Sequence, residues 1–203
     1  GLKTEPPTVS QPSIVYLEFR MARRKTGRKS EELIIKNVEM SRRRMDMITV
    51  RKAEKKDIAQ VKVLLSEVLE LHAKIRPDIF ISGTTKYTDE ELEGIFTNEE
   101  TPVFVAVDEQ EKVYGHVFCV MKRQPFSTNM HDFKTLYIDD LCVDESSRGQ
   151  HVGKTLYEYV LQYAKEQGCY DVTLNVWEGN DSARAFYEKM GMFVKETQME
   201  MLL

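Results

Sequence analysis

The chain has 203 residues, of which 41% are hydrophobic and 31% are charged, and its formal net charge at pH 7 is −4. A chain of this size can hold one sizeable core, and no apolar run approaches the roughly 18 residues that a membrane-spanning helix needs. The sequence therefore predicts a globular protein without a membrane partner.

The three cysteines and four histidines show no spacing that is typical of a metal site. Cys119, Cys142 and Cys169 lie far apart, in apolar surroundings and without a CxxC pair. This pattern indicates buried, reduced thiols rather than a disulfide framework. We therefore expect a cytoplasmic protein that uses no metal.

Residues 1–46 differ in charge from the rest of the chain. They hold 11 basic and 6 acidic residues, a net of +5, which leaves 18 basic and 27 acidic residues, a net of −9, from residue 47 onward. This split predicts a basic, poorly ordered N-terminal extension, or a segment upstream of a native start at Met45 or Met47, joined to one domain of residues 47–203. The extension lacks interleaved aromatic residues, so a nucleic-acid partner is not favoured.

The sequence of the first part of the domain predicts a strand followed by two helices. Residues 47–54 form a short strand, and residues 57–71 carry apolar side chains at helical spacing, which is typical of an amphipathic helix that covers a sheet. Thr88 and Glu91 are spaced as a capping box, so a second helix is expected to run from there to about Asn98.

A β-hairpin is predicted next. Residues 103–107 form one apolar strand, residues 108–111 a turn, and residues 113–121 the return strand. Residues 124–134 have no periodicity and predict a loop, in which His131 is expected to be a surface residue rather than a catalytic base.

Residues 137–154 then join a buried strand to a helix through a polar loop. The apolar residues of the strand are Ile138, Leu141 and Val143, and from Val152 onward the apolar spacing follows the 3.6-residue period of a helix. The unpaired N–H groups and the positive dipole end of such a helix form a phosphate-binding place.

Two nucleotide-binding motifs are weighed at this loop and set aside. Gly153, Lys154 and Thr155 match the end of a Walker A motif, but Arg148 stands where that motif requires its first glycine. The dinucleotide pattern G-x-G-x-x-G is absent from this segment. ATP, GTP and dinucleotide binding are therefore not favoured.

The remainder of the chain completes an α/β domain. The predicted elements are a helix over 152–167 ended by Gly168, a strand over 171–177, a helix over 183–190 ended by Gly191, and closing antiparallel strands over 192–194 and 198–202. The strand–helix–strand order implies a parallel, right-handed crossover. We expect a mixed sheet of six or seven strands with helices on both faces.

Two motifs resemble those of the GNAT superfamily of N-acetyltransferases, in its small bacterial form. Residues 148–153, RGQHVG, resemble the acyl-CoA pyrophosphate loop (Q or R, then x-x-G-x, then G or A), with His151 in place of the usual glycine. Residues 180–192, NDSARAFYEKMGM, resemble the family segment N-x-x-A-x-x-F-Y-x-x-x-G-F. Both motifs occur in the family's order and spacing, so the chain is identified as a member with the GNAT acyl-CoA N-acyltransferase fold.

The resemblance implies that acetyl-CoA is the cosubstrate and that a splayed pair of parallel strands receives it. Backbone groups of Leu141, Cys142 and Val143 would bind the pantetheine arm, although these residues also fit an ordinary core strand. Asn180 would contact the same arm, or only cap the following helix. The pyrophosphate would be held by the loop and the first helical turn, which comprise Arg148, Gly149, Gln150, His151, Val152, Gly153 and Lys154.

The resemblance also implies two catalytic residues. Tyr187 stands at the family's general-acid position, where a neutral phenol can protonate the departing thiolate. Tyr187 would also contact the pantetheine arm. The alternative role for this residue is packing on the sheet. Asp139 and Asp140 are adjacent carboxylates in an apolar strand, and alternation sends them to opposite faces. The run Asp139, Asp140, Leu141 resembles the Glu-Asp-apolar run of polyamine acetyltransferases, so Asp139 is the candidate base. A carboxylate bonded to loop N–H groups is the alternative.

The sequence thus predicts an N-acetyltransferase that moves the acetyl group of acetyl-CoA to a primary amine by direct attack. A small polyamine-like or aminoglycoside-like acceptor is favoured, because the domain is acidic. The alternatives are an acyl-CoA-binding regulatory module without turnover, or a protein N-terminal or lysine acetyltransferase. Asn175 weakens the N-terminal alternative, since enzymes that acetylate ribosomal-protein N-termini carry a glutamate there. The closing strands would also permit a homodimer.

Overall fold

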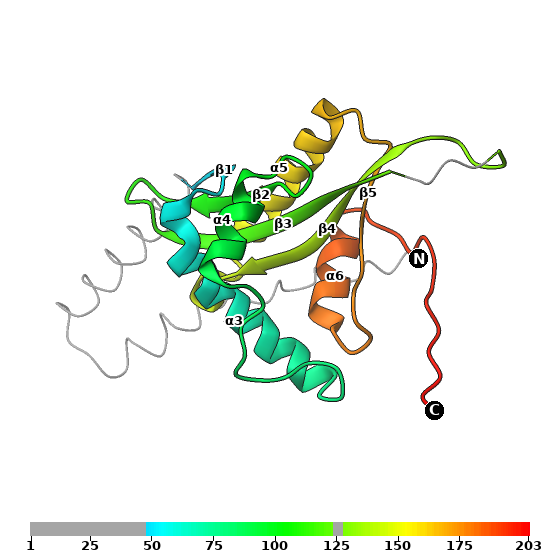
Figure 1. Cartoon of the computed structure of the whole chain (residues 1–203), viewed down its shortest axis with the longest axis horizontal. Coiled ribbons are helices and arrows are strands. Elements are labelled where there is room, and N and C mark those ends of the chain that lie inside the picture. Colours follow the sequence, from blue (N-terminus) through cyan, green and yellow to red (C-terminus); the bar gives the residue numbers. More distant parts are fainter. Residues whose placement is uncertain (1–47, 124–127) are drawn as a thin grey trace, which may run out of the picture. The chain divides into compact units, whose positions relative to one another are not determined.

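A five-stranded mixed sheet is the centre of the described part of the chain, residues 48–123 and 128–203 of a computed structural model (Figure 1). The strands follow the chain order across the sheet: β1 (Thr49–Lys52), β2 (Val103–Val107), β3 (Val113–Arg123), β4 (Lys134–Val143) and β5 (Asp171–Leu174). The first four pair antiparallel, and β4 pairs parallel with β5. The predicted α/β class is confirmed.

The expected number of six or seven strands is wrong for the described residues. The predicted strand over 171–177 ends at Leu174, and residues 192–194 and 198–202 form no strand. An alternating sequence becomes a strand only where a neighbouring strand accepts its backbone hydrogen bonds, and the outer edge of β5 does not do so here. The predicted extension, residues 1–46, lies outside the described residues, as do positions 124–127 of the predicted loop.

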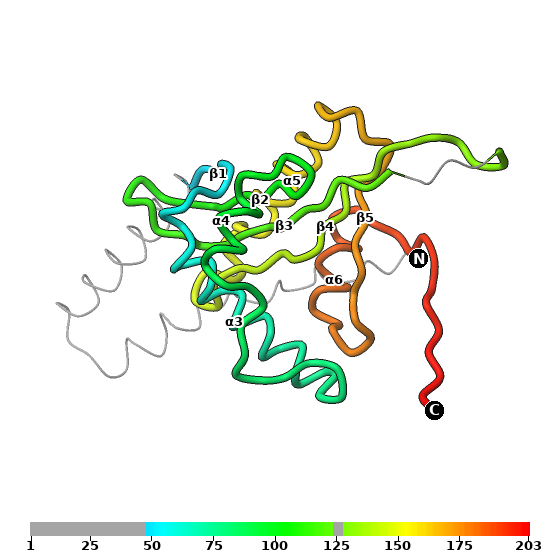
Figure 2. Tube along the Cα trace, viewed as in Figure 1, coloured from blue at the N-terminus to red at the C-terminus, as the bar shows by residue number. Residues whose placement is uncertain are grey.

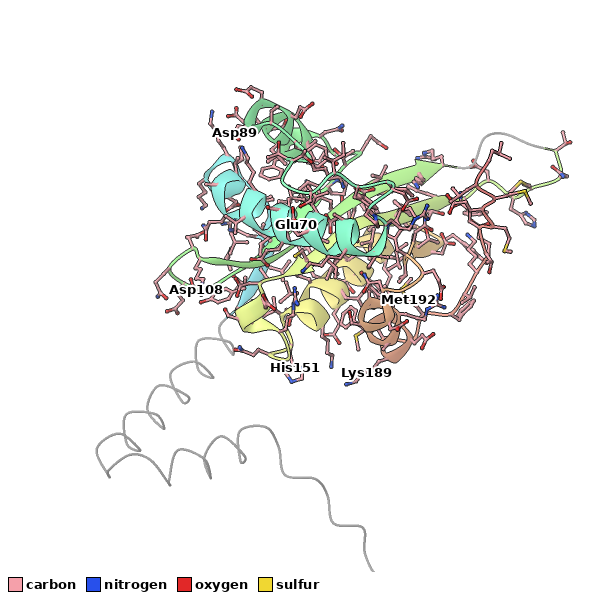
Figure 3. All side chains as sticks on the ribbon, turned by 90° about the horizontal axis from the view of Figure 1, so that it is seen from below. Glu70, Asp89, Asp108, His151, Lys189 and Met192 are labelled. Atoms are coloured by element: carbon pink, nitrogen blue, oxygen red, sulfur yellow. The ribbon has the colours of Figure 1, made fainter. Side chains whose placement is uncertain are left out.

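Helices cover both faces of the sheet (Figure 3). On one face lie α3 (Ile58–Ile75) and α4 (Asp89–Thr97), which enclose a core with the inward side chains of β2 and β3. On the other face lie α5 (Val152–Glu166) and α6 (Asp181–Lys189). The Phe104 ring of β2 contacts the rings of Tyr159 and Tyr163 of α5, with centroids 5.0 and 4.9 Å apart. The trace in Figure 2 follows β4, α5 and β5 as one crossover, which makes β4 and β5 parallel.

Capping residues set the start of α4 as predicted. The hydroxyl of Thr88 accepts a hydrogen bond from the Glu91 N–H (3.2 Å), and the Glu91 carboxylate accepts one from the Thr88 N–H (2.8 Å). This reciprocal pair satisfies two backbone donors that the helix itself cannot pair. A short 3₁₀ turn, η1 (Lys55–Asp57), precedes α3, and another, η2 (Glu145–Ser147), follows β4.

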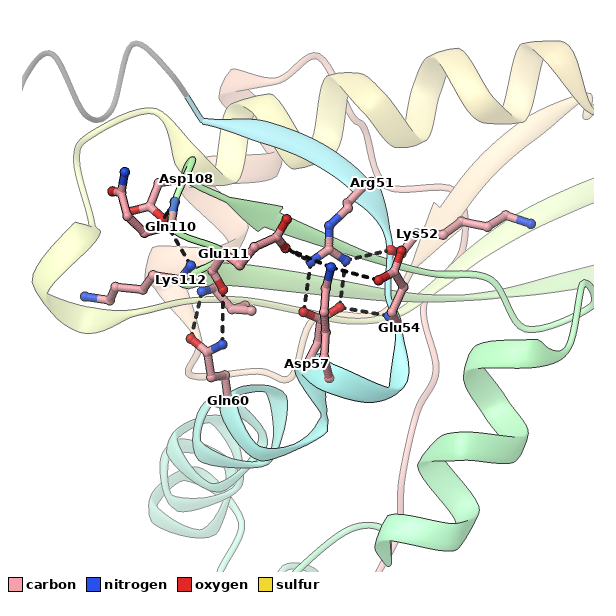
Figure 4. Close-up of polar contacts among 11 residues, drawn as sticks. Arg51, Lys52, Glu54, Asp57, Gln60, Asp108, Gln110, Glu111 and Lys112 are labelled. Atoms are coloured by element: carbon pink, nitrogen blue, oxygen red, sulfur yellow. Dashed lines mark hydrogen bonds and ion pairs between the residues drawn. The ribbon is translucent and has the colours of Figure 1, made fainter.

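A buried carboxylate links β1 to the start of α3 (Figure 4). Asp57 is fully buried, and Arg51 donates two hydrogen bonds to it (2.7 and 2.9 Å) while the Glu54 N–H donates a third (2.8 Å). Arg51 also bonds Glu111 in the turn between β2 and β3. Burial by itself would raise the pKa of Asp57, but these hydrogen bonds outweigh it, so the pKa lies below its usual value.

The register of β3 and β4 contains a β-bulge that the sequence did not reveal. Phe118 pairs with Asp140 and Cys119 pairs with Ile138, so Asp139 is the extra residue. Because paired residues share a face, Asp140 lies on the same face as Phe118, and so does Tyr137, which pairs with Val120. Simple alternation would put Asp139 on the Tyr137 side of β4 and Asp140 on the opposite face, and for Asp140 this expectation is wrong.

Candidate active site

The wedge between β4 and β5 is the centre of the candidate site. The two strands pair only from Thr135 to Ile138 on β4, with Asp171 to Leu174 on β5. Residues 139–143 of β4 continue without a β5 partner, and their pairing with β5 stops where the bulge at Asp139 bends the strand. The splay implied by the family resemblance is thus present. It leaves one side of the backbone of Leu141, Cys142 and Val143 without a partner from β5.

The N-terminus of α5 presents backbone donors beside this wedge. His151 is the N-cap residue, but its side chain makes no capping hydrogen bond, and it lies in the left-handed region with φ 67°. The first-turn N–H groups of Val152, Gly153 and Lys154 have no intrahelical acceptor. An anionic group placed there would receive these hydrogen bonds and the favourable end of the helix dipole.

Gly153 brings three elements of the site together. A Cβ added to it would lie 3.4 Å from the side chain of Val143 on β4 and 3.6 Å from the ring of Phe186 on α6. The start of α5 therefore packs directly against the wedge strand and against α6. In Figure 3, His151 at this helix end and Lys189 at the end of α6 lie on the same side of the molecule.

The charged side chains of the loop are exposed and weakly held. Arg148 is 57% exposed and 4.0 Å from Glu145, and Lys154 is 49% exposed and 3.7 Å from Glu158. Exposed ion pairs at such distances contribute little to stability, so both cations are free to turn toward an anionic ligand. Gly149 has φ 76°, a conformation that glycine adopts without strain, while Gln150 folds back onto the Ser146 carbonyl (2.9 Å).

Tyr187 extends from α6 into a partly buried aromatic cluster. Its ring centroid lies 5.1 Å from that of Phe186 and 6.2 Å from that of Tyr157. Burial, and then the negative charge of Asp140, raise the pKa of Tyr187 above its usual value. The phenol therefore remains protonated at neutral pH.

Asn180 serves as the N-cap of α6. Its side-chain oxygen accepts hydrogen bonds from the Ala183 N–H (3.3 Å) and the Ser182 hydroxyl (3.1 Å). The capping alternative is thus confirmed for this residue, which leaves a contact with the pantetheine arm as a prediction.

The two carboxylates at the bulge have different surroundings. Asp139 is 36% exposed and forms an ion pair with Lys86, whose Nζ lies 2.8 Å from its Oδ2. Asp140 is buried, and its Oδ2 lies 3.9 Å from Nε2 of His116, beyond direct hydrogen-bond distance. Burial raises the pKa of Asp140, but the nearby His116 and Lys86 outweigh this effect, so the pKa lies below its usual value.

Lys86 and His116 were not recognised as site residues in the sequence. Lys86 lies in the connection before α4, where nothing in the pattern indicates a contact with β4. His116 is a fully buried histidine in an apolar strand, and neither ring nitrogen has a hydrogen-bond partner within residues 48–123 and 128–203. For His116, the one signal in the sequence was its position as a lone polar residue inside an apolar run.

The cysteines are poor nucleophiles. Burial raises the pKa of Cys142 to about 12 and that of Cys119 to about 12, so both thiols are protonated at neutral pH. Cys142 also donates a hydrogen bond to the Leu64 carbonyl (3.5 Å). Within the described ranges, no group of three or more His, Cys, Asp or Glu residues could hold a metal ion, and no helix is long and apolar enough to cross a membrane.

Most of the domain matches a known protein family. The model of the Acetyltransferase (GNAT) family matches residues 65–192, more than half of the chain. The chain belongs to the GNAT family. This confirms the resemblance seen in the two motifs, and GNAT membership makes the protein an acetyl-CoA-dependent N-acetyltransferase.

Two of the similar proteins are N-acetyltransferases with different acceptors, and a third is a solved structure. A glucosamine 6-phosphate N-acetyltransferase from Arabidopsis thaliana is 31% identical over 124 residues, covering 59% of this chain and 80% of the relative. The peptidyl-lysine N-acetyltransferase YjaB of Salmonella typhimurium is 34% identical over 115 residues, covering 57% of this chain and 66% of the relative. A mutant BH1408 protein from Bacillus halodurans has 34% identity and a TM-score of 0.73, covering 76% of this chain and 99% of that one.

The geometry fits the cosubstrate that GNAT enzymes use. The uncapped first turn of α5 suits a diphosphate, and the unpartnered edge of β4 suits the amide groups of a pantetheine arm. Both features adjoin Gly153, so one extended ligand can reach both.

Proposed function

We propose that this GNAT enzyme acetylates a primary amine of a small, cationic acceptor by direct attack on acetyl-CoA. The observation that carries the proposal is the Lys86–Asp139 ion pair at the bulge of β4, where a primary ammonium lies 2.8 Å from a carboxylate beside the wedge. The lysine ammonium has the same chemistry as the acceptor group. The carboxylate can therefore hold such a cation at this position.

Donor binding is assigned to the wedge and to the start of α5. Backbone groups of Leu141, Cys142 and Val143 pair with the pantetheine arm in place of a β5 partner, and Asn180 contributes from the start of α6. The diphosphate is bound by the backbone of Gly149, Gln150, His151, Val152 and Gly153, and by the cations of Arg148 and Lys154. Acetyl-CoA supplies the activated acetyl group.

Tyr187 is proposed as the general acid. Its phenol is protonated at neutral pH because burial and the charge of Asp140 disfavour the phenolate. As the amine nitrogen bonds to the acetyl carbon and the carbon–sulfur bond breaks, Tyr187 gives its proton to the departing thiolate. A direct attack also fits the protonated state of the two buried thiols, which cannot serve as an acyl-accepting nucleophile.

Asp139 is proposed to bind the acceptor ammonium and to accept its proton through water. It is exposed enough to reach solvent, whereas Asp140 is buried and adds fixed negative charge behind it. Lys86 must move aside for the acceptor, so it competes for the same carboxylate. The acidic balance of the domain, residues 47–203, favours cationic acceptors in the same way.

The alternatives are a module that binds acyl-CoA without turnover and an enzyme that acetylates a protein N-terminus or lysine. An assay of thiol release from acetyl-CoA distinguishes these alternatives from the proposal. The acceptors tested are polyamines, aminoglycosides, glucosamine 6-phosphate and a lysine-bearing peptide. We expect a small amine to be the best acceptor. We also expect Tyr187→Phe to lower kcat about a hundredfold or more, with the exposed Tyr170→Phe as the matched control. If calorimetry shows CoA binding while no amine elicits thiol release, the protein is an acyl-CoA-binding module without turnover.

A further inference from the structure

The ammonium of Lys86 occupies the place that the proposed function gives to the acceptor. Its Nζ donates a hydrogen bond to Oδ2 of Asp139 (2.8 Å), although the two residues lie 53 positions apart in the chain. Their side chains are 38% and 36% exposed, so solvent reaches the pair. Lys86 lies in the connection between α3 and α4, outside any helix or strand. A primary amine of the protein itself is therefore bound by the carboxylate that is proposed to bind the substrate amine.

Two further interactions hold this ammonium in the site. Nζ lies 5.2 Å from the centroid of the Tyr87 ring, within the range of a cation–π contact, and that ring stacks on Phe118 of β3 with centroids 5.9 Å apart. Burial lowers the pKa of Lys86, but the hydrogen bond to Asp139 and the negative charge of Asp140 outweigh it, so the pKa lies above its usual value. Lys86 is therefore an ammonium at neutral pH, and it must lose a proton before it can attack, as a free amine must.

The proposed path of acetyl-CoA leads to the same place. A Cβ added to Gly153 would lie 3.4 Å from Val143, so the diphosphate site at the start of α5 adjoins the C-terminal end of β4. A pantetheine arm that follows the unpartnered edge of β4 from there passes residues 143 to 141 in that order. The bulge at Asp139 comes next, just before the pairing with β5 begins. The thioester at the end of the arm would then lie beside Asp139, and with it beside the Lys86 ammonium.

We propose that the enzyme acetylates its own Lys86, using acetyl-CoA bound in the same molecule, when no acceptor occupies the site. The inference rests on the proposed function, because it uses the same wedge, the same carboxylate and the same acid. Asp139 accepts one proton from the ammonium through water, and the freed Nζ bonds to the acetyl carbon as the carbon–sulfur bond breaks. Tyr187 gives its proton to the departing thiolate and regains one from the new amide nitrogen. The products are acetylated Lys86, free CoA and one proton released to solvent.

The tether of Lys86 to the protein favours this reaction over attack by a dilute amine. The Lys86 ammonium is present at the site without a binding step, which gives it the advantage of an intramolecular reaction. A free acceptor displaces it only by binding to Asp139 in its place. Acetyl-CoA that is bound without an acceptor therefore has the Lys86 amine beside its thioester.

Acetylation changes how the site binds its substrate. An acetylated lysine carries no charge, so it cannot form the ion pair with Asp139. The carboxylate then binds the acceptor ammonium without a competitor, and the acetylated enzyme is the form with the lower KM for a cationic acceptor. The loss of one partly exposed ion pair corresponds to a change of about two- to fivefold.

Lys62 provides a matched comparison for Lys86. Its Nζ lies 2.5 Å from Oδ1 of Asp89, and its side chain is 35% exposed, close to the value for Lys86. The Lys62 pair joins α3 to the start of α4, whereas the Lys86 pair lies at the wedge end of β4. Exposure and ion pairing are alike for the two lysines, so a difference in their acetylation reports the catalytic site.

The first test incubates the full chain with acetyl-CoA alone and follows acetylation by peptide mass spectrometry. We expect Lys86 to gain one acetyl group at a rate per molecule that is independent of protein concentration, because the reaction is intramolecular. Tyr187→Phe should slow this reaction about a hundredfold or more, and Lys62 should react far more slowly than Lys86. The proposal is overturned if Lys86 stays unmodified, if Lys62 is labelled equally, if the rate rises with protein concentration, or if Tyr187→Phe has no effect.

The second test compares the KM of an amine acceptor for wild type, Lys86→Gln and Lys62→Gln in initial-rate measurements. Glutamine resembles acetylated lysine in carrying no charge. We expect Lys86→Gln to lower KM about two- to fivefold with little change in kcat, and Lys62→Gln to leave both unchanged. Equal thermal unfolding of the variants confirms that they fold. A KM that Lys86→Gln leaves unchanged or raises overturns the competition between Lys86 and the acceptor on which the proposal rests.

Thiol release with the amine panel reports the proposed function separately. An enzyme that acetylates an amine but leaves Lys86 unmodified overturns this inference, and the proposed function stands. Acetylation of Lys86 without turnover of any small amine supports this inference, and the small acceptor is then wrong.

Discussion

Replacing Gly115 by alanine should disturb the two elements that we propose bind the cosubstrate, β4 and α5. Gly115 lies on β3, opposite Val143 of the wedge strand. An added Cβ would lie 2.7 Å from the Cys142 carbonyl oxygen, 3.0 Å from Cδ1 of Leu156 and 3.4 Å from Cγ1 of Val152. The nearest of these atoms belongs to backbone, so it cannot be relieved by a rotamer change. The wedge strand must therefore shift, and the side chain of Leu156 on α5 must give way.

The magnitude follows from the cost of adding one methyl group to a close-packed site, about 1–3 kcal/mol. For a chain of this size each kcal/mol corresponds to roughly 2–4 °C in Tm, so Gly115→Ala should lower Tm by about 2–12 °C. Gly94→Ala is the matched control. It lies in α4 with no atom within 4 Å of its added Cβ, and alanine is favoured there by roughly 0.5–1 kcal/mol.

The assay is thermal unfolding of both variants together with CoA binding by calorimetry. Gly115→Ala should melt earlier and bind CoA more weakly, whereas Gly94→Ala should melt slightly later and bind CoA as the wild type does. If Gly115→Ala melts with the wild type and binds CoA equally well, the close contact with Cys142 is not as described. The assignment of CoA to this strand would then be wrong.

Three further outcomes follow from the site and its supports. Tyr187→Phe should lower kcat at neutral pH about a hundredfold or more, while CoA affinity stays within a factor of about three; an unchanged kcat at neutral pH would exclude Tyr187 as the acid. Asp139→Asn should lower kcat and alter the pH–rate profile, so an unaltered profile shows that Asp139 is not the base. Asp57→Asn should cost roughly 3–5 kcal/mol at neutral pH, since it breaks the ion pair between the buried Asp57 and Arg51. Because the folded-state pKa of Asp57 is lowered, that stability is present above its unfolded pKa and lost as pH falls through the folded one. The difference in Tm between Asp57→Asn and wild type should therefore shrink in acid, and a constant difference would contradict the reasoning.

Local signals predicted much of the fold. The Thr88 and Glu91 pair marked the start of α4, and apolar spacing located α3 and α5, because caps and helical faces depend on residues close in the chain. The family was equally readable, since the loop and the α6 segment are contiguous motifs. The end of β5 and the fate of residues 192–202 were not readable, because a strand needs a partner from elsewhere.

The candidate site divides in the same way. Tyr187, Asp139 and the helix-opening loop were chosen from the sequence, since each lies within a short motif. Lys86 and His116 were not, because their contacts with the two aspartates join segments far apart in the chain.

The sequence alone identified this protein as a GNAT acetyltransferase and predicted where its donor loop lies, because a phosphate site at a helix start needs only neighbouring residues. Tertiary structure alone decided which way the carboxylates of β4 face. A one-residue bulge against β3 shifts the register, and with it the side of the sheet that Asp140 occupies. The pairing between two strands depends on both segments at once, so it cannot be predicted from either segment alone.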